Sequence, residues 1–232
     1  MTSRIRGAVS TTTSENKRIN NTLPVAREGF PFILTGVVLT GLFFVLHLPL
    51  LGAVFCALTL FTVYFFRDPS RTPQVEEKAV LAPADGKLLG VTGLERSAGN
   101  PEGKVLKVSI FMSLFDVHVN RIPAAGKIAQ VSYHPGKFLA ANLDKASEQN
   151  ERNTVTLETG EGRKVVFVQV AGLIARRIAC WVQQGDEVRT GQRFGLIRFG
   201  SRVDLFLPGD SRVVAVTGQK VRAGETIIGY LP

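Results

Sequence analysis

The chain has 232 residues, of which 45% are hydrophobic, and its 28 Lys and Arg residues outnumber its 19 Asp and Glu residues, giving a formal charge of +9. This length suffices for one or two domains with a hydrophobic core, and the basic balance favours an anionic membrane surface or an anionic substrate as partner. Nucleic acid is not expected as a partner, because the basic residues are scattered and form no nucleic-acid-binding motif. Cys56 and Cys180 belong to no Cys/His cluster, so neither a metal site nor a disulfide framework is expected.

The first 29 residues are polar, rich in Ser, Thr and Asn, and carry several basic side chains. We expect residues 1–29 to form a disordered or loosely held tail, on the side of a membrane where basic residues accumulate. They do not resemble a secretory signal, because the apolar stretch starts only at about Phe30 and no small-residue cleavage site follows it.

Residues 30–66 form an apolar segment without Lys, Arg, Asp or Glu. His47-Leu48-Pro49 divides it into two arms of about 17 residues, each spanning roughly 25 Å as a helix, slightly less than a bilayer core. We predict a helical hairpin that either crosses the cell membrane or enters one leaflet. Arg27 precedes it and Arg67 and Arg71 follow it, which favours both ends on the cytoplasmic side. The alternative is a buried helix pair in a soluble core.

Residues 67–232 predict a mostly β (α+β) domain. After a proline-containing linker, short β-branched or alternating runs recur, separated by Gly, Pro, Asn and Asp. We expect a barrel-sandwich-like arrangement, with a short helix around Phe138–Ser147. No lysine has the context of a lipoyl or biotinyl attachment site, so a carrier module is not expected. The expected strands are Lys87–Thr92, Lys104–Phe111, Lys127–Tyr133, Thr154–Glu158, Lys164–Val170, Ile174–Val182, Arg193–Arg198, Val203–Leu207 and Arg212–Thr217.

The step Gly200-Ser201 has two interpretations. One is a tight turn or bulge, in which glycine supplies unusual dihedral angles and serine hydrogen-bonds locally. The other is a self-cleaving peptide bond, in which Ser201 Oγ attacks the Gly200 carbonyl carbon and the resulting ester breaks down to a pyruvoyl group.

Four further motifs accompany this step: Pro83-Ala84-Asp85-Gly86, the run Phe115–Pro123 with His118, the run Tyr133–Phe138 with His134, and Gln149–Asn153. Together with Phe199-Gly200-Ser201-Arg202, their order and spacing resemble the phosphatidylserine decarboxylases, specifically the short, archaeal-type branch. The resemblance covers residues 67–232, and the preceding hairpin is in keeping with it.

The resemblance implies a proenzyme that is cut between Gly200 and Ser201. A β chain (residues 1–200) and an α chain (residues 201–232) would then stay associated. Ser201 would become the pyruvoyl cofactor, which would form a Schiff base with the amine of phosphatidylserine. Loss of CO2 would give phosphatidylethanolamine, so the implied enzyme is a carboxy-lyase of phospholipid biosynthesis.

The resemblance also implies an Asp/His/Ser relay for the cut, with Asp85 as its acid. Its histidine is less clear, because Arg121 stands where the second histidine of the family's motif is expected. We therefore expect His118 or His134 to supply the base, with His118 favoured. All three could instead be structural: Asp85 as a turn residue, the histidines through backbone hydrogen bonds.

Three basic residues, Arg121, Lys137 and Arg152, are candidates for binding the substrate phosphate or carboxylate, or are ordinary surface charges. Two other functions stay open: a pyruvoyl-dependent decarboxylase of a soluble amino acid, and a membrane-tethered β module without catalysis. The apolar hairpin argues against the first, since a soluble substrate needs no anchor.

Overall fold

The computed structural model describes residues 19–74, 76–95, 104–141, 143, 146–173, 177–198 and 200–232. The chain divides into two compact units, residues 21–70 and residues 71–232 with the segment before residue 21. Most of the tail expected over residues 1–29 lies outside the described residues, and so does Phe199 of the motif around Ser201.

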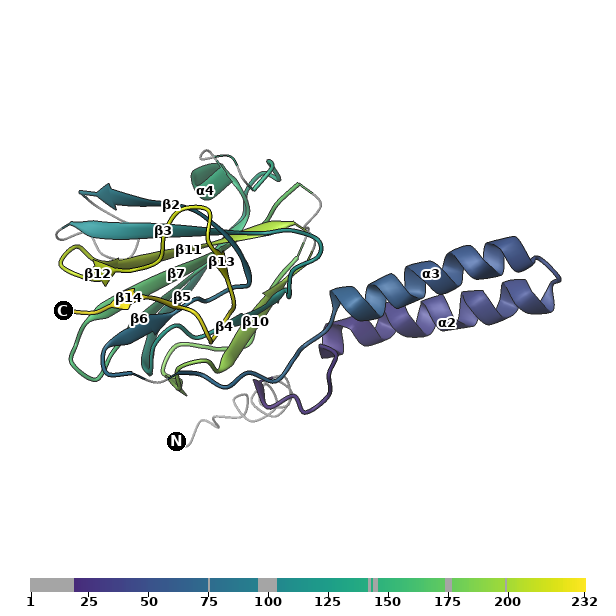
Figure 1. Ribbon diagram of the computed structural model, residues 1–232, viewed down its shortest axis with the longest axis horizontal. Helices are drawn as coiled ribbons and strands as arrows, with labels where there is room; N and C mark the ends of the chain where they lie inside the picture. Colours follow the sequence, from purple (N-terminus) through teal and green to yellow (C-terminus); the bar gives the residue numbers. More distant parts are fainter. Residues whose placement is uncertain are drawn as a thin grey trace, which may run out of the picture. The chain divides into compact units, whose positions relative to one another are not determined.

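The unit of residues 21–70 is an antiparallel pair of helices, as predicted (Figure 1). His47 turns the chain between the helices with a φ of +55°, and Pro49 occupies the first turn of the second helix, where its missing amide hydrogen is not needed. A Cβ added at Gly36 would lie 2.3 Å from the Thr59 hydroxyl, so a glycine lets the helices approach closely. The helical elements are η1 (Arg27–Gly29), α2 (Phe30–Val45) and α3 (Pro49–Phe65).

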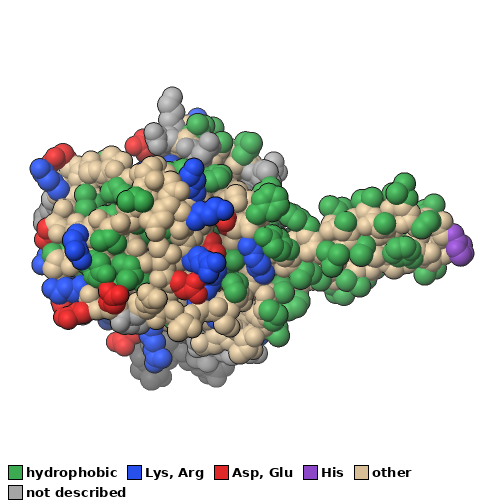
Figure 2. Space-filling view, in the orientation of Figure 1, with side chains coloured by type: hydrophobic (Ala, Val, Ile, Leu, Met, Phe, Trp, Pro, Cys, Tyr) green, Lys and Arg blue, Asp and Glu red, His purple; other side chains and the backbone are tan. Residues whose placement is uncertain are grey.

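The surface of this helical pair is apolar. Hydrophobic side chains cover its visible face in Figure 2, and Leu34, Val45 and Leu50 are each exposed by more than half. The helical stretch Arg27–Val45 is long and apolar enough to cross a membrane by length and composition, and α3 is a shorter apolar helix. An apolar surface of this extent marks a contact with a membrane or another apolar partner.

The second unit is built from antiparallel strands in three sheets, which confirms the mostly β prediction (Figure 1). The largest sheet has eight strands, in the order β13 (Lys220–Val221), β2 (Gly86–Leu94), β3 (Val105–Met112), β11 (Ser201–Pro208), β7 (Lys164–Val170), β6 (Arg152–Glu158), β5 (Gly126–His134) and β9 (Glu187–Val188). A three-stranded sheet contains β4 (Val119–Arg121), β10 (Arg193–Ile197) and β8 (Ile178–Cys180). The other contains β1 (Ala79–Leu81), β14 (Ile227–Tyr230) and β12 (Arg212–Val213).

The helix expected around Phe138–Ser147 is wrong for residues 138–141, which are not helical, whereas a short helix, α4 (Ala146–Gln149), follows. The cause is a long-range contact. Asn150 accepts a hydrogen bond from the Leu139 amide at 2.9 Å and donates one to the Leu139 carbonyl at 2.8 Å. These bonds use the backbone groups of Leu139 that a helix would need.

Strand β11 lies in the middle of the large sheet and divides its side chains between two faces. Ser201, Val203 and Leu205 point into the main hydrophobic core and are fully buried. Phe206 points to the other face, where it packs against a smaller cluster that includes Val166. We call these two sides the core face and the outer face.

The outer face of β11 carries a buried cluster of charges directly after Ser201. Arg202 pairs with Asp204, and its Nη2 donates a hydrogen bond to Ser109 Oγ at 2.8 Å. Asp204 accepts a hydrogen bond from Ser147 at 2.8 Å and lies 3.4 Å from the Lys107 ammonium. Each charge therefore has an opposite partner, which buried ionised groups require.

Candidate active site

The Gly-Ser step lies at the entry to β11. Gly200 has a φ of +57°, in the left-handed region that glycine adopts without strain. Ser201 is the first residue of β11 and pairs with Met112 of β3, so the strand begins earlier than the predicted Val203. Its side chain is fully buried, and its hydroxyl donates a hydrogen bond to the Met112 thioether at 3.6 Å. A thioether is a weak acceptor, so this contact holds the hydroxyl only loosely.

The carbonyl of Gly200 is closely approached by the backbone that follows β7. A Cβ added at Gly172 would lie 1.8 Å from the Gly200 oxygen. Asn150 fixes this backbone, because its Nδ2 donates hydrogen bonds to the carbonyls of Leu139 at 2.8 Å and Ala171 at 2.7 Å. Gly172 has no role predicted from the sequence, since nothing in its local sequence reveals this contact.

We expect Gly172→Ala to slow the formation of the cleaved chain at least about tenfold and to cost about 1–3 kcal/mol of stability, because the new methyl group must push the Gly200 carbonyl aside. The measurement is the cleaved fraction on a denaturing gel over time, with thermal unfolding alongside. Gly90→Ala is the matched control, since a Cβ there meets nothing within 4 Å. Equal cleavage rates in the two variants would contradict the importance of this approach.

A buried polar chain leads away from the Met112 sulfur on the core face. Asn120 Nδ2 contacts this sulfur at 3.7 Å, and Asn120 Oδ1 accepts a hydrogen bond from Gln169 at 2.9 Å. Gln169 in turn accepts one from Asn153 at 3.2 Å. Asn120, Asn153 and Gln169 are all buried. Buried amides with such partners are held in fixed orientations, so Asn120 presents a defined polar edge beside Ser201.

His118 lies just before β4 and is fully buried. Its carbonyl accepts a hydrogen bond from the Ile197 amide at 3.4 Å, which extends the β4–β10 ladder toward the segment that leads into β11. Side chains two residues apart in an extended strand share a face, so His118 lies on the same side as Asn120. Asn120 and Ser201 both contact the sulfur of Met112. The fold therefore places His118 in the neighbourhood of the predicted nucleophile.

His134 and Arg152 point to the other side of the sheet. The strand register aligns Arg202 with Val170, Val170 with Arg152, and Arg152 with His134. Directly paired residues of antiparallel strands share a face, and neighbours along a strand point to opposite faces. His134 and Arg152 are therefore on the outer face, whereas Ser201 points to the core face.

The other two basic candidates have different environments. Arg121 is buried, and its Nη1 donates a hydrogen bond to the Gly191 carbonyl at 2.9 Å. This bond ties β4 to the turn before β10, which is a structural use of the residue at the second histidine position. Lys137 is exposed, and its amide donates to the Gln149 carbonyl at 2.7 Å.

Asp85 is buried directly before β2, at the same end of the large sheet as Ser201, with β3 between their strands. Its carboxylate accepts hydrogen bonds from Arg71 at 2.9 Å and from the Ala223 amide at 2.7 Å. Burial raises the pKa of Asp85, and the positive charge of Arg71 opposes this rise. Arg71, expected only as a charge flanking the hairpin, also binds Glu225 at 2.9 Å. It is thus the counterion of the predicted relay acid.

We expect Arg71→Met to lower the stability of an uncut chain by about 3 kcal/mol at neutral pH, because Asp85 is then left buried without its counterion. Without Arg71 the pKa of Asp85 rises further, so the stability loss is greatest above that pKa and shrinks as the pH falls through it and the carboxyl binds a proton. Urea unfolding at several pH values measures this. Adding Asp85→Asn to Arg71→Met should remove the pH dependence of the stability loss. A stability loss in Arg71→Met that is the same at every pH would contradict the role of Arg71 as the counterion of Asp85.

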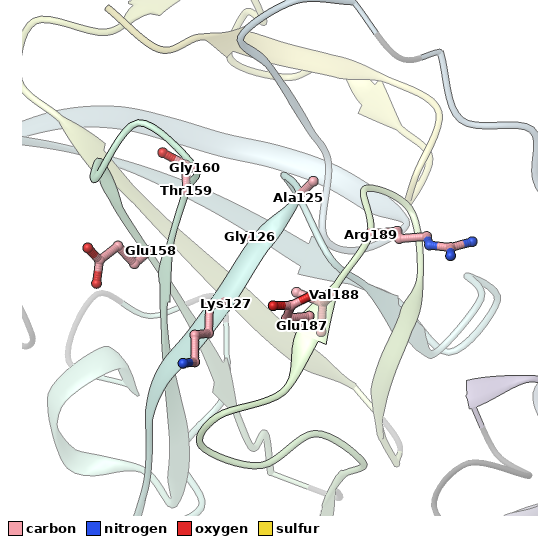
Figure 3. A pocket seen from close by; sticks show the side chains of 9 residues that line it. All are labelled: Ala125, Gly126, Lys127, Glu158, Thr159, Gly160, Glu187, Val188 and Arg189. Atoms are coloured by element: carbon pink, nitrogen blue, oxygen red, sulfur yellow. The ribbon is translucent and has the colours of Figure 1, made fainter.

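One cavity of the β unit is lined by residues of β5, β6 and β9. It is a groove of about 770 Å³ at the end of β6 opposite to Arg152, and Ser201 is not in its lining (Figure 3). Its rim mixes acidic and basic side chains, with Lys127 and Arg189 beside Glu158 and Glu187. Among the residues that the structure describes, no group of three or more His, Cys, Asp or Glu side chains is placed to hold a metal ion.

Comparisons with known proteins agree on one family. Residues 58–229 match the family model of phosphatidylserine decarboxylase. A relative from Desulfotalea psychrophila is 48% identical over 209 residues, covering 90% of this chain and 97% of the relative. Relatives from Syntrophus aciditrophicus (46% over 208 residues; 88% of this chain and 96% of the relative) and Pelobacter propionicus (47% over 220 residues; 91% and 99%) are similar. All three are named phosphatidylserine decarboxylase proenzyme. The chain therefore belongs to the phosphatidylserine decarboxylase family.

Proposed function

We propose that this chain is the proenzyme of a phosphatidylserine decarboxylase, which cuts itself between Gly200 and Ser201 and then converts phosphatidylserine into phosphatidylethanolamine and CO2. The observation that carries the proposal is the place of Ser201, a buried hydroxyl at the start of a central strand, directly after a glycine in the left-handed conformation. The names of the relatives, phosphatidylserine decarboxylase proenzyme, support the substrate and the maturation.

In the proposed maturation, Ser201 Oγ attacks the carbonyl carbon of Gly200 and the peptide C–N bond breaks, giving an ester and a free Ser201 amine. Loss of the Ser201 α-proton then expels the Gly200 carboxylate. The dehydroalanine that remains takes up a proton at Cβ and becomes an imine with a methyl group. One water hydrolyses this imine, which releases ammonia and leaves a pyruvoyl group on residues 201–232. A hydroxyl needs a base for such an attack. We assign this role to His118, because it is buried on the side of Asn120, whereas His134 lies on the outer face.

The surroundings of Ser201 fit a pyruvoyl group, which has a methyl group where the serine has its hydroxymethyl side chain and a ketone oxygen where the serine has its amine. Its carbonyl supplies an electron sink for the loss of CO2 from an amino acid. Gln169 donates to Asn120 Oδ1, so the Asn120 amide hydrogens stay directed toward Met112 and the start of β11. The full burial of Ser201 keeps bulk water away from this position.

For the anionic headgroup we propose Lys137 first among the basic candidates. It is exposed, and it begins the segment that Asn150 pins beside Gly172. Arg121 and Arg152 are retained as weaker candidates, because hydrogen bonds to the carbonyls of Gly191 and Glu148 occupy part of each guanidinium. We propose that Asp85 acts with Arg71 as the acidic end of the relay.

We also propose that the hairpin of residues 30–66 holds the enzyme at the cell membrane, with both of its ends on the cytoplasmic side. The apolar helices and the basic residues Arg27 and Arg67 at the two ends support this. The net charge of +9 adds an attraction to anionic lipid headgroups, including the proposed substrate.

Mass spectrometry of the purified chain tests the proposed function. We expect a fragment of residues 201–232 whose N-terminus is lighter than serine by one ammonia, and decarboxylation of phosphatidylserine in vesicles but not of free amino acids. An intact chain of 25.2 kDa without this fragment would overturn self-processing. Activity on free serine alone would favour a decarboxylase of soluble substrates.

A further inference from the structure

Large apolar side chains are exposed around the end of the β unit where β11 begins. Phe115 is 66% exposed, Leu173 is 65% exposed and Leu143 is 49% exposed. Isolated exposed apolar residues are common on protein surfaces, but several that surround one site indicate a contact surface. We call these three residues the apolar rim.

Each residue of the apolar rim lies on a backbone segment that is in contact with the start of β11 or adjacent to it in the fold. Phe115 lies in the turn after Met112, and Asp116 fixes this turn by accepting hydrogen bonds from the Ser113 amide at 2.8 Å and the Ser113 hydroxyl at 2.7 Å. Leu173 follows Gly172, whose backbone abuts the Gly200 carbonyl. The rim residues Phe115 and Leu173 are therefore held on short backbone segments beside the scissile bond.

The third member is tied to the residue that follows the nucleophile. The carbonyl of Leu143 accepts a hydrogen bond from Arg202 at 3.3 Å, while the Leu143 side chain is half exposed. Exposed basic residues belong to the same end. The Arg177 carbonyl accepts a hydrogen bond from the Arg198 amide at 3.4 Å, just before β11, and Lys137 begins the segment pinned beside Gly172.

The opposite end of the large sheet has a different surface. In the described turns of residues 159–163 and 209–211, no large apolar side chain is among the exposed ones. Charged pairs lie there instead, with Arg163 at 3.9 Å from Asp210 and Lys78 at 4.0 Å from Glu161. The apolar rim is thus a property of the end that carries Ser201.

We propose that the apolar rim is a second membrane-contact surface, on which Phe115, Leu143 and Leu173 enter the interfacial layer of an anionic bilayer. Aromatic and aliphatic side chains suit this layer, and Arg177 and Lys137 complement anionic headgroups. The choice of a bilayer as occupant rests on the proposed function. A headgroup whose acyl chains stay in the membrane reaches Ser201 only if this end of the β unit faces the lipid.

Fluorescence quenching in the full chain tests the contact without using activity. The variant Phe115→Trp is reconstituted into vesicles of phosphatidylcholine and phosphatidylglycerol whose acyl chains carry bromine. The native Trp181 is 2% exposed, and its signal is subtracted with the unsubstituted chain. The matched control is Gly160→Trp in the turn at the opposite end, where an added Cβ meets nothing within 4 Å.

We expect bromolipid to quench the new tryptophan of Phe115→Trp at least about twofold more than that of Gly160→Trp, since the first would lie in the interface and the second in water. Absence of quenching in Phe115→Trp would overturn the proposal, and so would equal quenching of both variants. An apolar rim that is covered by a second copy or another protein would also give no quenching. The result does not depend on decarboxylation, so a failed proposed function would leave it readable.

A kinetic arm uses the double variant Phe115→Asp with Leu173→Asp. We expect the KM for phosphatidylserine in vesicles to rise about tenfold or more, while the kcat/KM for a short-chain, soluble phosphatidylserine stays unchanged. Gly160→Asp is the control, because Gly160 lies in the turn at the opposite end of the large sheet and an added Cβ there meets nothing within 4 Å. Equal effects on both substrates would contradict a membrane-contact role and indicate a change in the site itself.

Discussion

Ser201→Ala will leave the chain uncut and will abolish decarboxylation, because the variant lacks both the nucleophile and the atoms that would become the pyruvoyl group. The fold should persist, since the buried hydroxyl donates its hydrogen bond to the weakly accepting sulfur of Met112. We expect a stability change within about 1 kcal/mol for the uncut chain. A denaturing gel, intact mass and thermal unfolding measure the three effects.

Trapping of the ester provides a second check on the same step. In the unsubstituted chain, hydroxylamine should cut the ester formed by Ser201 and label the new C-terminus at Gly200, because esters react with it far faster than peptides do. The variant Ser201→Ala should give no such product. A cut at the same bond in Ser201→Ala would show that another group performs the attack.

His118→Ala should slow the self-cut by roughly 100-fold or more, the range that a positioned general base contributes. The structure gives this prediction its matched control. His134→Ala removes a histidine from the outer face of the sheet and should change the rate by no more than about threefold. The time course of cleavage after synthesis, followed on a gel at several pH values, measures both variants.

Two results would change the assignment of the base. If His134→Ala slows the cut and His118→Ala does not, the proton passes along a route on the outer face that the strand register does not suggest. If neither His118→Ala nor His134→Ala slows the cut, Ser201 is activated by a group other than these histidines. A folded His118→Ala chain that binds phosphatidylserine vesicles would show that a slow cut does not result from unfolding.

The sequence predicts the parts of this fold that depend on local patterns. The apolar run of residues 30–66 with Pro49 in its middle specifies a hairpin, and most strands follow from β-branched alternation. It fails at residues 138–141, where helix-forming residues are held in another conformation by the side chain of Asn150. Local propensity is a weak guide wherever such a tertiary contact competes with it.

In the candidate site, too, some features follow from local sequence patterns and others depend on tertiary contacts. Gly200 and Ser201 stand out as a motif, but Gly172 and Arg71 act through contacts with residues distant in the sequence. The role of Gln169 could have been suspected from the sequence, because it is a polar residue within the mostly apolar strand Lys164–Val170. The orientation of the two histidines follows from strand register, which only the assembled sheet defines.

Strand β11 is paired along its length with β3 and along much of it with β7, and its charged residues Arg202 and Asp204 bind partners on the other side of the cut. The proposed cleavage would therefore turn one folding chain into a heterodimer that shares a single sheet. Refolding would become bimolecular, so recovery after denaturation would depend on protein concentration. The serine needed to make the cofactor again would be gone, so a fragment lost by unfolding could not be replaced from within the molecule. The lifetime of the mature enzyme would then be set by how slowly this central strand leaves the sheet.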